Sequence, residues 1–214
     1  MKRFSLNELK LAIDAGCDQF GDDEMIIVGS LSLLGHAKGE LPDAIQTTMD
    51  IDLYPKNVPT EKNLDTARMA LDYGEGSKFR QEHGWYIEVM GTWVTDRATG
   101  WQDRTNPVTT ERGNVGHCIS PLDLAFIKAT VGREKDYKQV KDMIGVGYLS
   151  YGDLKKFITD FPPPLELQRE KASEFIVKLQ GMLNETPLLE IPRVPTKGEH
   201  FYPTGAGKTG YATK

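Results

Sequence analysis

The chain has 214 residues, with 26 Lys and Arg against 31 Asp and Glu, so its formal net charge is −5. This mildly acidic balance excludes a protein that coats nucleic acid with its whole surface, although it permits local basic patches. The two cysteines, Cys17 and Cys118, lie far apart without a CxxC motif, which argues against a disulfide framework and a cysteine zinc site. No apolar run reaches the roughly 20 residues of a membrane span, and we therefore expect a cytoplasmic protein without membrane contact.

The first elements are a helix, a buried strand and a tight turn. A capping box that begins at Ser5 predicts a helix with apolar residues at helical spacing up to about Gly16. The apolar run 25–28 predicts a short buried strand. It stops at Gly29-Ser30, after which closely spaced leucines indicate the start of a buried helix.

Two further strands are expected before residue 91. Residues 47–54 alternate between polar and apolar side chains, which predicts a half-buried strand with Met49 on its apolar face. A helix over 60–71 follows, and then a strand over 85–90 that lies between two glycines. The polar stretch 92–116 contains several turn residues and has room for one or two short strands.

Helical patterns fill the second half of the chain. Ser120 at the N-cap, followed by proline at the first helical position, predicts a helix to about Val131. Helical spacing continues over 134–144, and Ser150 begins another short helix that a run of prolines ends. A last helix is expected over 165–183.

This order of elements predicts an α+β (mixed α/β) fold with a small mixed sheet and a C-terminal helical segment. Prolines and glycines with few apolar anchors indicate an extended tail after residue 186. We therefore divide the chain into a sheet domain over 1–145, a helical extension over 146–186 and an extended tail over 187–214. The basic residues of the tail leave weak contact with nucleic acid or a partner open.

The clearest sign of chemistry is the pair Asp50 and Asp52 in the alternating strand. Residues two apart in a strand project from one face, so both carboxylates point at one spot. Two carboxylates this close repel each other unless they share a cation, and hard oxygen ligands suit Mg²⁺ or Mn²⁺. The alternative interpretation is a polar strand edge that faces solvent.

Two further features strengthen the first interpretation. Gly29-Ser30 lies between a predicted strand and a predicted helix, where glycine allows close backbone approach and N–H groups face an anion. Such turns also use glycine and serine for geometry alone. Glu88 adds a third acid on a later strand. A Gly-Ser turn, two aligned acids and a third carboxylate together form the constellation expected for metal-assisted nucleotidyl transfer.

Basic residues of the second half add a possible phosphate contact. Lys128 lies in an otherwise apolar helix, so we expect its ammonium to reach out of the core towards an anion. Further on, lysine and arginine exceed the acids, and this patch could neutralise a triphosphate or RNA phosphates. A solvated helix face held by i,i+4 pairs is the alternative. The patch contains Arg133, Lys135, Lys138 and Lys141, with Glu134 and Asp136.

The histidines give weaker signals. None of the four stands at zinc-ligand spacing from another ligand. His83 precedes the strand that carries Glu88, where it either bonds near the site or serves as a turn residue. His117 and Cys118 are adjacent, so on a strand their side chains would point to opposite faces, which excludes a Cys-His dyad.

Together these motifs resemble the nucleotidyltransferase superfamily that includes DNA polymerase β, in which a Gly-Ser turn, a DxD-type pair and a third carboxylate recur. Over roughly residues 25–144 the chain is also similar to an uncharacterised bacterial nucleotidyltransferase family related to toxins of the AbiEii and MenT type. The motifs that carry this second resemblance are Gly74-Glu75-Gly76-Ser77-x-Phe79, His83-Gly84-x-Tyr86-x-Glu88, Trp101-Gln102-Asp103-Arg104, Pro121-x-Asp123-Leu124-Ala125-x-x-Lys128 and Gly132-Arg133-x-Lys135-Asp136.

The resemblance implies a nucleotidyltransferase-like catalytic domain over 1–145 that uses Mg²⁺ or Mn²⁺. The implied catalytic residues are Asp50, Asp52, Glu88 and Lys128, of which the three acids are also the metal ligands. The implied nucleotide-binding residues are Gly29, Ser30, Arg133, Lys135 and Asp136.

The resemblance also implies an NTP substrate whose nucleoside monophosphate is transferred to an acceptor. The implied acceptor is tRNA, and the implied setting is a toxin–antitoxin or phage-defence pair with a cognate antitoxin as partner. Two alternatives stay open. One is a non-catalytic, nucleotide-binding or antitoxin-like partner protein with a degenerate nucleotidyltransferase fold, which the glutamate at position 88 favours. The other is a metal-dependent phosphohydrolase that uses the same acids.

Overall fold

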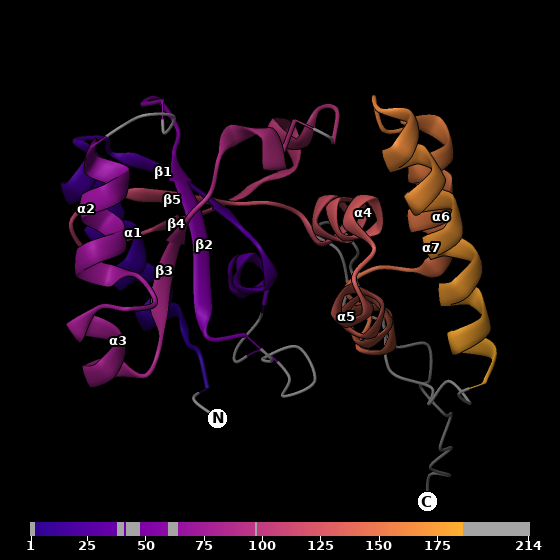
Figure 1. The fold of residues 1–214 in the computed structure, drawn as a ribbon, viewed down its shortest axis with the longest axis horizontal. Helices are drawn as coiled ribbons and strands as arrows, with labels where there is room; N and C mark the ends of the chain where they lie inside the picture. The colour runs from indigo at the N-terminus through magenta and orange to yellow at the C-terminus, as the bar shows by residue number, and fades with distance from the viewer. Residues whose placement is uncertain (1–2, 38–40, 42–47, 60–63, 97, 186–214) are drawn as a thin grey trace, which may run out of the picture.

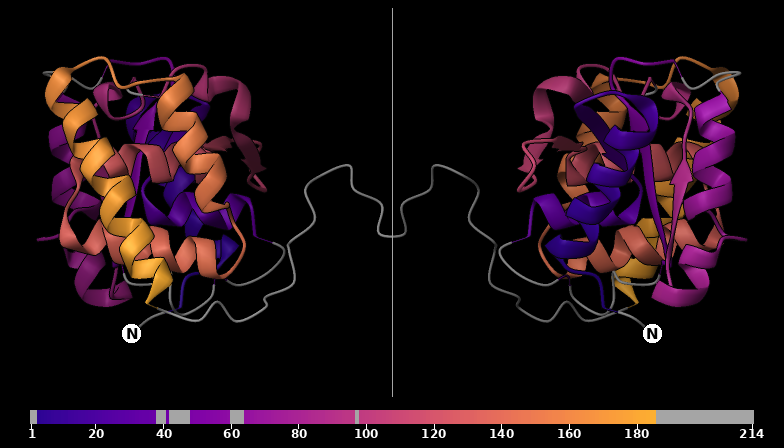
Figure 2. Two further views of the ribbon diagram at one scale, coloured as in Figure 1. Left: turned by 90° about the vertical axis from the view of Figure 1, so that its right-hand side faces the viewer. Right: turned by 90° about the vertical axis from the view of Figure 1, so that its left-hand side faces the viewer.

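The computed structural model describes residues 3–37, 41, 48–59, 64–96 and 98–185. Within these residues a mixed β-sheet carries helices α1 to α3 on one side, and a layer of helices α4 to α7 stands on the other side (Figure 1). Figure 2 shows the two outer faces, one formed by the orange helices of the C-terminal layer and the other by the indigo and purple N-terminal helices. The α+β class and the small mixed sheet predicted from the sequence are confirmed.

The sheet has the strand order β3-β2-β1-β5-β4. The central strand β1 runs antiparallel to β2 and parallel to β5, while β2 and β3 are parallel and β4 and β5 antiparallel. The four apolar residues of this central strand are buried, as their unbroken run predicted. The strands are β1 (Glu24–Val28), β2 (Asp50–Pro55), β3 (Tyr86–Val89), β4 (Asn106–Thr109) and β5 (Val115–Cys118).

Helix α1 (Leu6–Phe20) covers one face of the sheet. It begins at the predicted capping box, in which the Ser5 backbone N–H donates to Glu8 Oε2 at 2.9 Å. The helix continues past Gly16, because that glycine packs directly on side chains of β1 and β2, and it ends at Gly21 in the left-handed conformation. The apolar side of β2 therefore faces α1, and its acidic side faces the opposite helical layer.

The remaining N-terminal elements depart from the sequence expectations in detail. The short helix α3 (Lys78–His83) was not foreseen, and it follows α2 (Leu64–Tyr73). His83 closes α3 and stacks on Phe79 at a centroid distance of 4.4 Å, consistent with the turn interpretation. The leucines after Ser30 form a 3-10 helix instead of an α-helix, and Met49 is 48% exposed because β2 begins only at the next residue.

The polar stretch between β3 and α4 contains two strands, as expected, and two short 3-10 helices, Thr92–Val94 and Trp101–Arg104. The second of these is tied to the helical layer by a strong ion pair. Arg104 Nη2 donates to Asp123 Oδ1 at 2.6 Å, and the Asp123 side chain is fully buried. This pair fixes the loop region of the sheet against the start of α4.

Helix α4 forms the middle of the second layer. Ser120 caps it by accepting from the Asp123 backbone N–H at 3.1 Å, and Gly132 ends it with a φ of 71°. Nearly all of its residues are buried, because α5, α6 and α7 pack around it. The four helices are α4 (Pro121–Val131), α5 (Glu134–Gly145), α6 (Tyr151–Asp160) and α7 (Glu166–Asn184), close to the predicted ranges.

Some expectations fall on residues that the structure does not describe. Thr47, residues 60–63 at the start of the second predicted helix, and the tail over 187–214 lie outside the described residues. The three-part division of the chain stays a prediction. No helix among the described residues has both the length and the apolar character needed to cross a membrane.

We predict that Gly116→Ala in β5 destabilises the protein. A Cβ there would overlap Ile13 Cδ1 and crowd Ile27, so the substitution should lower the free energy of unfolding by about 1–3 kcal/mol. Gly181→Ala is the matched control, because Gly181 lies exposed in α7 with open space around it. That change should raise stability by about 0.5–1 kcal/mol. Urea unfolding of both variants measures this contrast, and equal effects would contradict it.

Candidate active site

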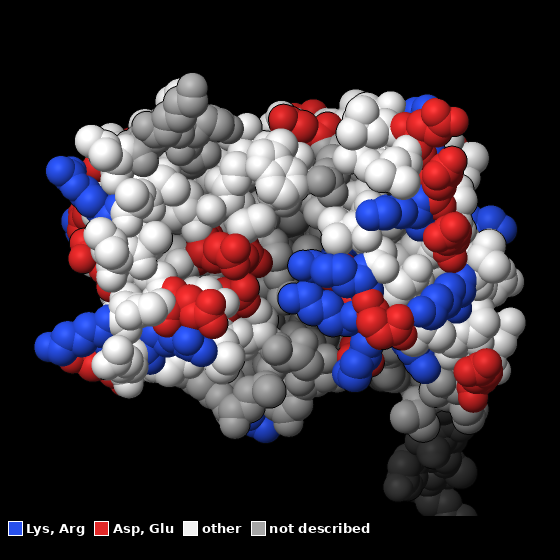
Figure 3. Space-filling view, viewed as in Figure 1, with Lys and Arg blue, Asp and Glu red and all other residues white. Residues whose placement is uncertain are grey.

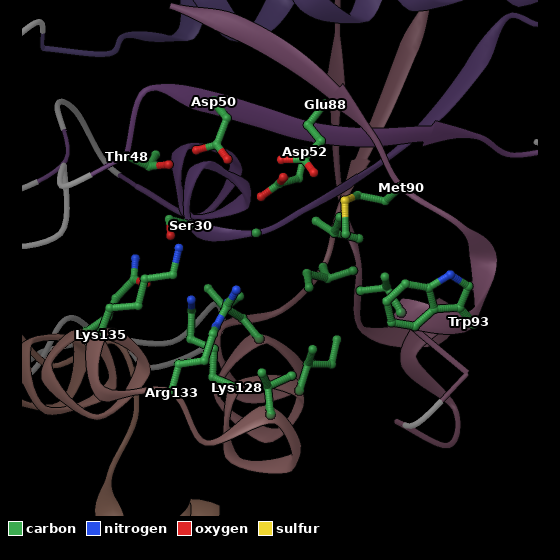
Figure 4. A pocket seen from close by; sticks show the side chains of 18 residues that line it. Ser30, Thr48, Asp50, Asp52, Glu88, Met90, Trp93, Lys128, Arg133 and Lys135 are labelled. Carbon is green, nitrogen blue, oxygen red and sulfur yellow. The ribbon is translucent and has the colours of Figure 1, made fainter. Parts of the chain in front are cut away.

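Three carboxylates meet at one edge of the sheet. Asp50 and Asp52 alternate on the face of β2 that points away from α1, and Glu88 stands opposite Asp52 on the parallel strand β3. One ligand oxygen from each residue lies within 4.8 Å of the others. Figure 4 shows the three side chains converging. The strand alternation and the β2–β3 register therefore bring the three predicted acids together.

Gly29 makes this arrangement possible. It follows β1, where Val28 pairs with Asp52, and its φ of 64° lies in the left-handed region. A Cβ at position 29 would overlap the carboxylate of Asp52. The glycine thus gives space to a carboxylate, and the buried Ser30 beside it lines the adjoining cavity. Ser32 Oγ holds the turn by donating to the Gly29 carbonyl at 2.8 Å.

A cavity of about 400 Å³ separates the acids from helices α4 and α5. Lys128 of α4, Arg133 of the α4–α5 connection and Lys135 of α5 line the wall opposite the acids. Figure 3 shows this opposition on the surface, with acidic side chains on one side of the hollow and basic side chains on the other. The cavity thus offers carboxylates for cations and cationic groups for phosphates.

Asp136 lies behind the cationic wall and does not line the cavity. Its fully buried carboxylate accepts from Arg133 Nε at 2.9 Å and from Lys128 Nζ at 3.3 Å. Although burial raises the pKa of Asp136, the hydrogen bond from Arg133 and the charge of Lys128 outweigh it and keep that pKa below its ordinary value. Asp136 thus has the geometry of a positioning residue for the two cations.

Lys138 and Lys135 have different surroundings on the same helix. Lys138 donates to Asp142 at 2.8 Å in an exposed i,i+4 pair, as the solvated-face interpretation expects. Lys135, by contrast, points from α5 into the cavity (Figure 4). The basic patch seen in the sequence therefore divides between a cavity wall and an ordinary helix surface.

The acids strongly influence one another. Burial, followed by the charges of Asp50 and Glu88, raises the pKa of Asp52 to about 7, although Lys128 and Lys135 act in the opposite direction. Burial and the charge of Asp50 also raise the pKa of Glu88. A divalent cation bound among the three would relieve this repulsion. The donor set, three carboxylate oxygens without nitrogen or sulfur, fits a hard cation such as Mg²⁺ or Mn²⁺.

The cavity contains residues that sequence reasoning missed. Thr48, Met90, Trp93 and Gln139 all line it. Gln139 could have been found, because it follows Lys135 by one helical turn and so shares its face. Its side-chain Nε2 is buried and has no hydrogen-bond partner among the described residues. No periodic pattern marks Trp93, which lies in a single-turn 3-10 helix.

A family model matches most of the chain. The model of the family described as "Nucleotidyltransferase of unknown function (DUF6036)" matches residues 7–178. This range contains the sheet, the three acids and the cationic wall, together with most of helix α7. Neither the search of curated proteins nor the search of solved structures found a match.

We predict that Asp52→Asn stabilises the metal-free protein in a pH-dependent way. Between its unfolded value of 3.8 and about 7, the folded chain keeps the Asp52 proton while the unfolded chain releases it. The contribution of Asp52 to wild-type stability therefore falls as pH rises through this window and levels off above it. The gain from Asp52→Asn should be small near pH 4 and reach at most about 4 kcal/mol near pH 8.

Urea unfolding with EDTA present, at a series of pH values, measures this difference. Asp72→Asn on the exposed side of α2 is the control and should show no such trend. A stability difference between Asp52→Asn and wild type that is independent of pH would contradict the argument.

Proposed function

Since the chain belongs to a family of nucleotidyltransferases of unknown function, we propose that it transfers a nucleoside monophosphate from an NTP to an acceptor hydroxyl. The observation that carries the proposal is the cavity in which three carboxylates face three cationic side chains. A nucleoside triphosphate complexed with Mg²⁺ or Mn²⁺ has the complementary charges, because its metal meets the acids and its phosphates meet the cations. A neutral or purely anionic ligand would leave one wall uncompensated.

In this proposal Asp50, Asp52 and Glu88 hold the divalent cations. When bound, these cations supply Lewis-acid stabilisation of charge on the phosphoryl oxygens. Lys128 and Arg133, oriented by Asp136, hold the phosphates and neutralise the charge that develops on pyrophosphate. Because their donors are fixed before substrate binds, little reorganisation is needed during the reaction.

The acceptor oxygen attacks the α-phosphorus, and the bond from that phosphorus to the bridging oxygen of pyrophosphate breaks. We assign the acceptor's proton to Glu88, because it is the most exposed of the three acids and therefore the most accessible to an acceptor. A carboxylate oxygen of Glu88 acts here as the general base. The proton thus moves from the acceptor hydroxyl to Glu88, and pyrophosphate leaves towards the cationic wall.

We further propose tRNA as the acceptor and a toxin–antitoxin or phage-defence setting in the cytoplasm, with an antitoxin as partner. The support for these points is the resemblance to AbiEii- and MenT-type toxins.

A non-catalytic nucleotide-binding or antitoxin-like protein is the second candidate. The observation in its favour is the exposure of Glu88, which leaves the third carboxylate less firmly placed than the other two. Calorimetry with Mg²⁺ and each NTP distinguishes this candidate from loss of the site altogether. A chain that binds nucleotide and turns over none would fit it. A phosphohydrolase would instead release phosphate and leave no modified acceptor.

We predict that Asp52→Ala reduces transfer at least about 100-fold, because a ligand of the cations is lost. The assay incubates the protein with labelled NTPs, Mg²⁺ and bulk tRNA and follows label in the tRNA and in pyrophosphate. EDTA should abolish the wild-type signal, and Asp72→Ala should leave it unchanged. Transfer that survives both Asp52→Ala and EDTA would refute the proposed site.

We also predict different effects for two lysines of α5. Lys135→Ala should weaken NTP binding about tenfold, because a charged contact to phosphate is lost. Lys138→Ala, which removes only the exposed pair with Asp142, should change it less than about twofold. Both side chains are exposed, so neither change should disturb the fold. Calorimetric titration with NTP and Mg²⁺ measures both, and equal effects would contradict the assignment of Lys135 to the phosphate wall.

A further inference from the structure

The cavity has a second end that the transfer chemistry does not use. Met90 follows Glu88 by two residues on β3, so it continues the acidic face of the sheet with an apolar side chain. Trp93 also lines the cavity, and Leu124 and Ile127 of α4 are among its further apolar lining residues. The cavity therefore has apolar and aromatic lining in addition to its charged groups.

Trp93 has an unusual combination of exposure and restraint. It is 55% exposed, whereas most other aromatic side chains among the described residues are buried or partly buried. Its indole lies over the backbone of Gly91, because a Cβ at that position would overlap Trp93 Nε1. Gly91 has an ordinary φ of −85°, so the backbone itself does not require glycine. The glycine instead leaves space for the indole at the mouth of the cavity.

The groups along the cavity follow a fixed order. Figure 4 shows Ser30 and Lys135 on one side of the three acids and Met90 and Trp93 on the other. Ser30 with Lys135, the cation ligands and the aromatic surface therefore follow one another in this view, and Lys128 and Arg133 lie across the cavity from the acids. A nucleoside triphosphate has the same order, because its phosphates are at one end and its planar base at the other.

We propose that Trp93 stacks on the nucleobase of the bound NTP and that Gly91 positions its indole for this contact. This inference rests on the proposed function, because it uses the same cavity. Base stacking on an aromatic ring is favourable for every base, since each has a π-face. Leu124 and Ile127 add apolar surface to the same cavity, and a base bound against such surface would be withdrawn from water.

The test compares ligands with and without a base. Isothermal titration with Mg²⁺ measures binding of each of the four ribonucleoside triphosphates and of inorganic tripolyphosphate. Wild type is compared with Trp93→Ala, Trp93→Phe and Gly91→Ala. Leu71→Ala, which removes an exposed apolar side chain of α2 far from the cavity lining, is the control. Thermal unfolding of each variant checks that the fold is kept.

Trp93→Ala should weaken binding of the preferred NTP about tenfold and change tripolyphosphate binding less than twofold. Trp93→Phe should restore most of the lost affinity, because it retains an aromatic face. Gly91→Ala should reproduce part of the loss while the indole is still present. Leu71→Ala should match wild type for both ligands.

Three outcomes would overturn the inference. Equal losses of affinity for NTP and for tripolyphosphate in Trp93→Ala would indicate that Trp93 has a structural role and does not contact the base. An unchanged NTP affinity in Trp93→Ala, with or without a higher KM for the acceptor, would show that the base does not stack on Trp93. Failure of wild type to bind any NTP would also contradict the inference. By contrast, Trp93-dependent NTP binding without any transfer to an acceptor would refute the proposed function and leave the inference intact.

Discussion

The mutual repulsion of three carboxylates sets the conditions for the rest of this structure. Asp50, Asp52 and Glu88 place ligand oxygens within 4.8 Å of one another, and burial strengthens the repulsion by limiting how far water screens it. The strands fix this proximity, because the alternation of β2 and its register with β3 place all three side chains on the same face of the sheet. Gly29 completes the arrangement by leaving room for the Asp52 carboxylate. Such a cluster opposes folding unless cations balance it, which is typical of a site kept for binding and not for stability.

The helical layer supplies part of that balance. Lys128 lies in a helix that is buried on nearly all sides, where an unpaired ammonium would be costly. Burial accordingly lowers the pKa of Lys128, and the buried carboxylate of Asp136 acts against this by pairing with it. The same carboxylate holds Arg133 at the start of α5. One buried acid thus orients two cations towards the cavity, while the Arg104–Asp123 pair fixes the start of α4 against the sheet region.

The acidic part of the candidate site could be predicted because its signal is local. A period of two places Asp50 and Asp52 on one face of any strand, whichever fold contains it. The capping residues of α1 and α4 could also be predicted, since a cap depends on neighbours three residues away. The position of the Asp136 side chain could not be predicted from the sequence. The family resemblance implied that Asp136 contacts nucleotide, but one helical step beyond Lys135 turns it inward, and the packing of α4 against α5 buries it.

The sequence by itself determined most of the helices and strands, the shared face of Asp50 and Asp52 and the reaction class that such acids suit, because these depend on periodicity and on side-chain chemistry. Tertiary structure alone decided what stands opposite the acids. Strand pairing brought Glu88 beside Asp52, and helix packing placed Lys128 and Lys135 across one cavity from them. It also placed Trp93 in the lining of that cavity, although the residue lies in a single turn without periodic pattern. Distances across a cavity depend on how separate layers pack, and the spacing of residues along the chain does not indicate this packing.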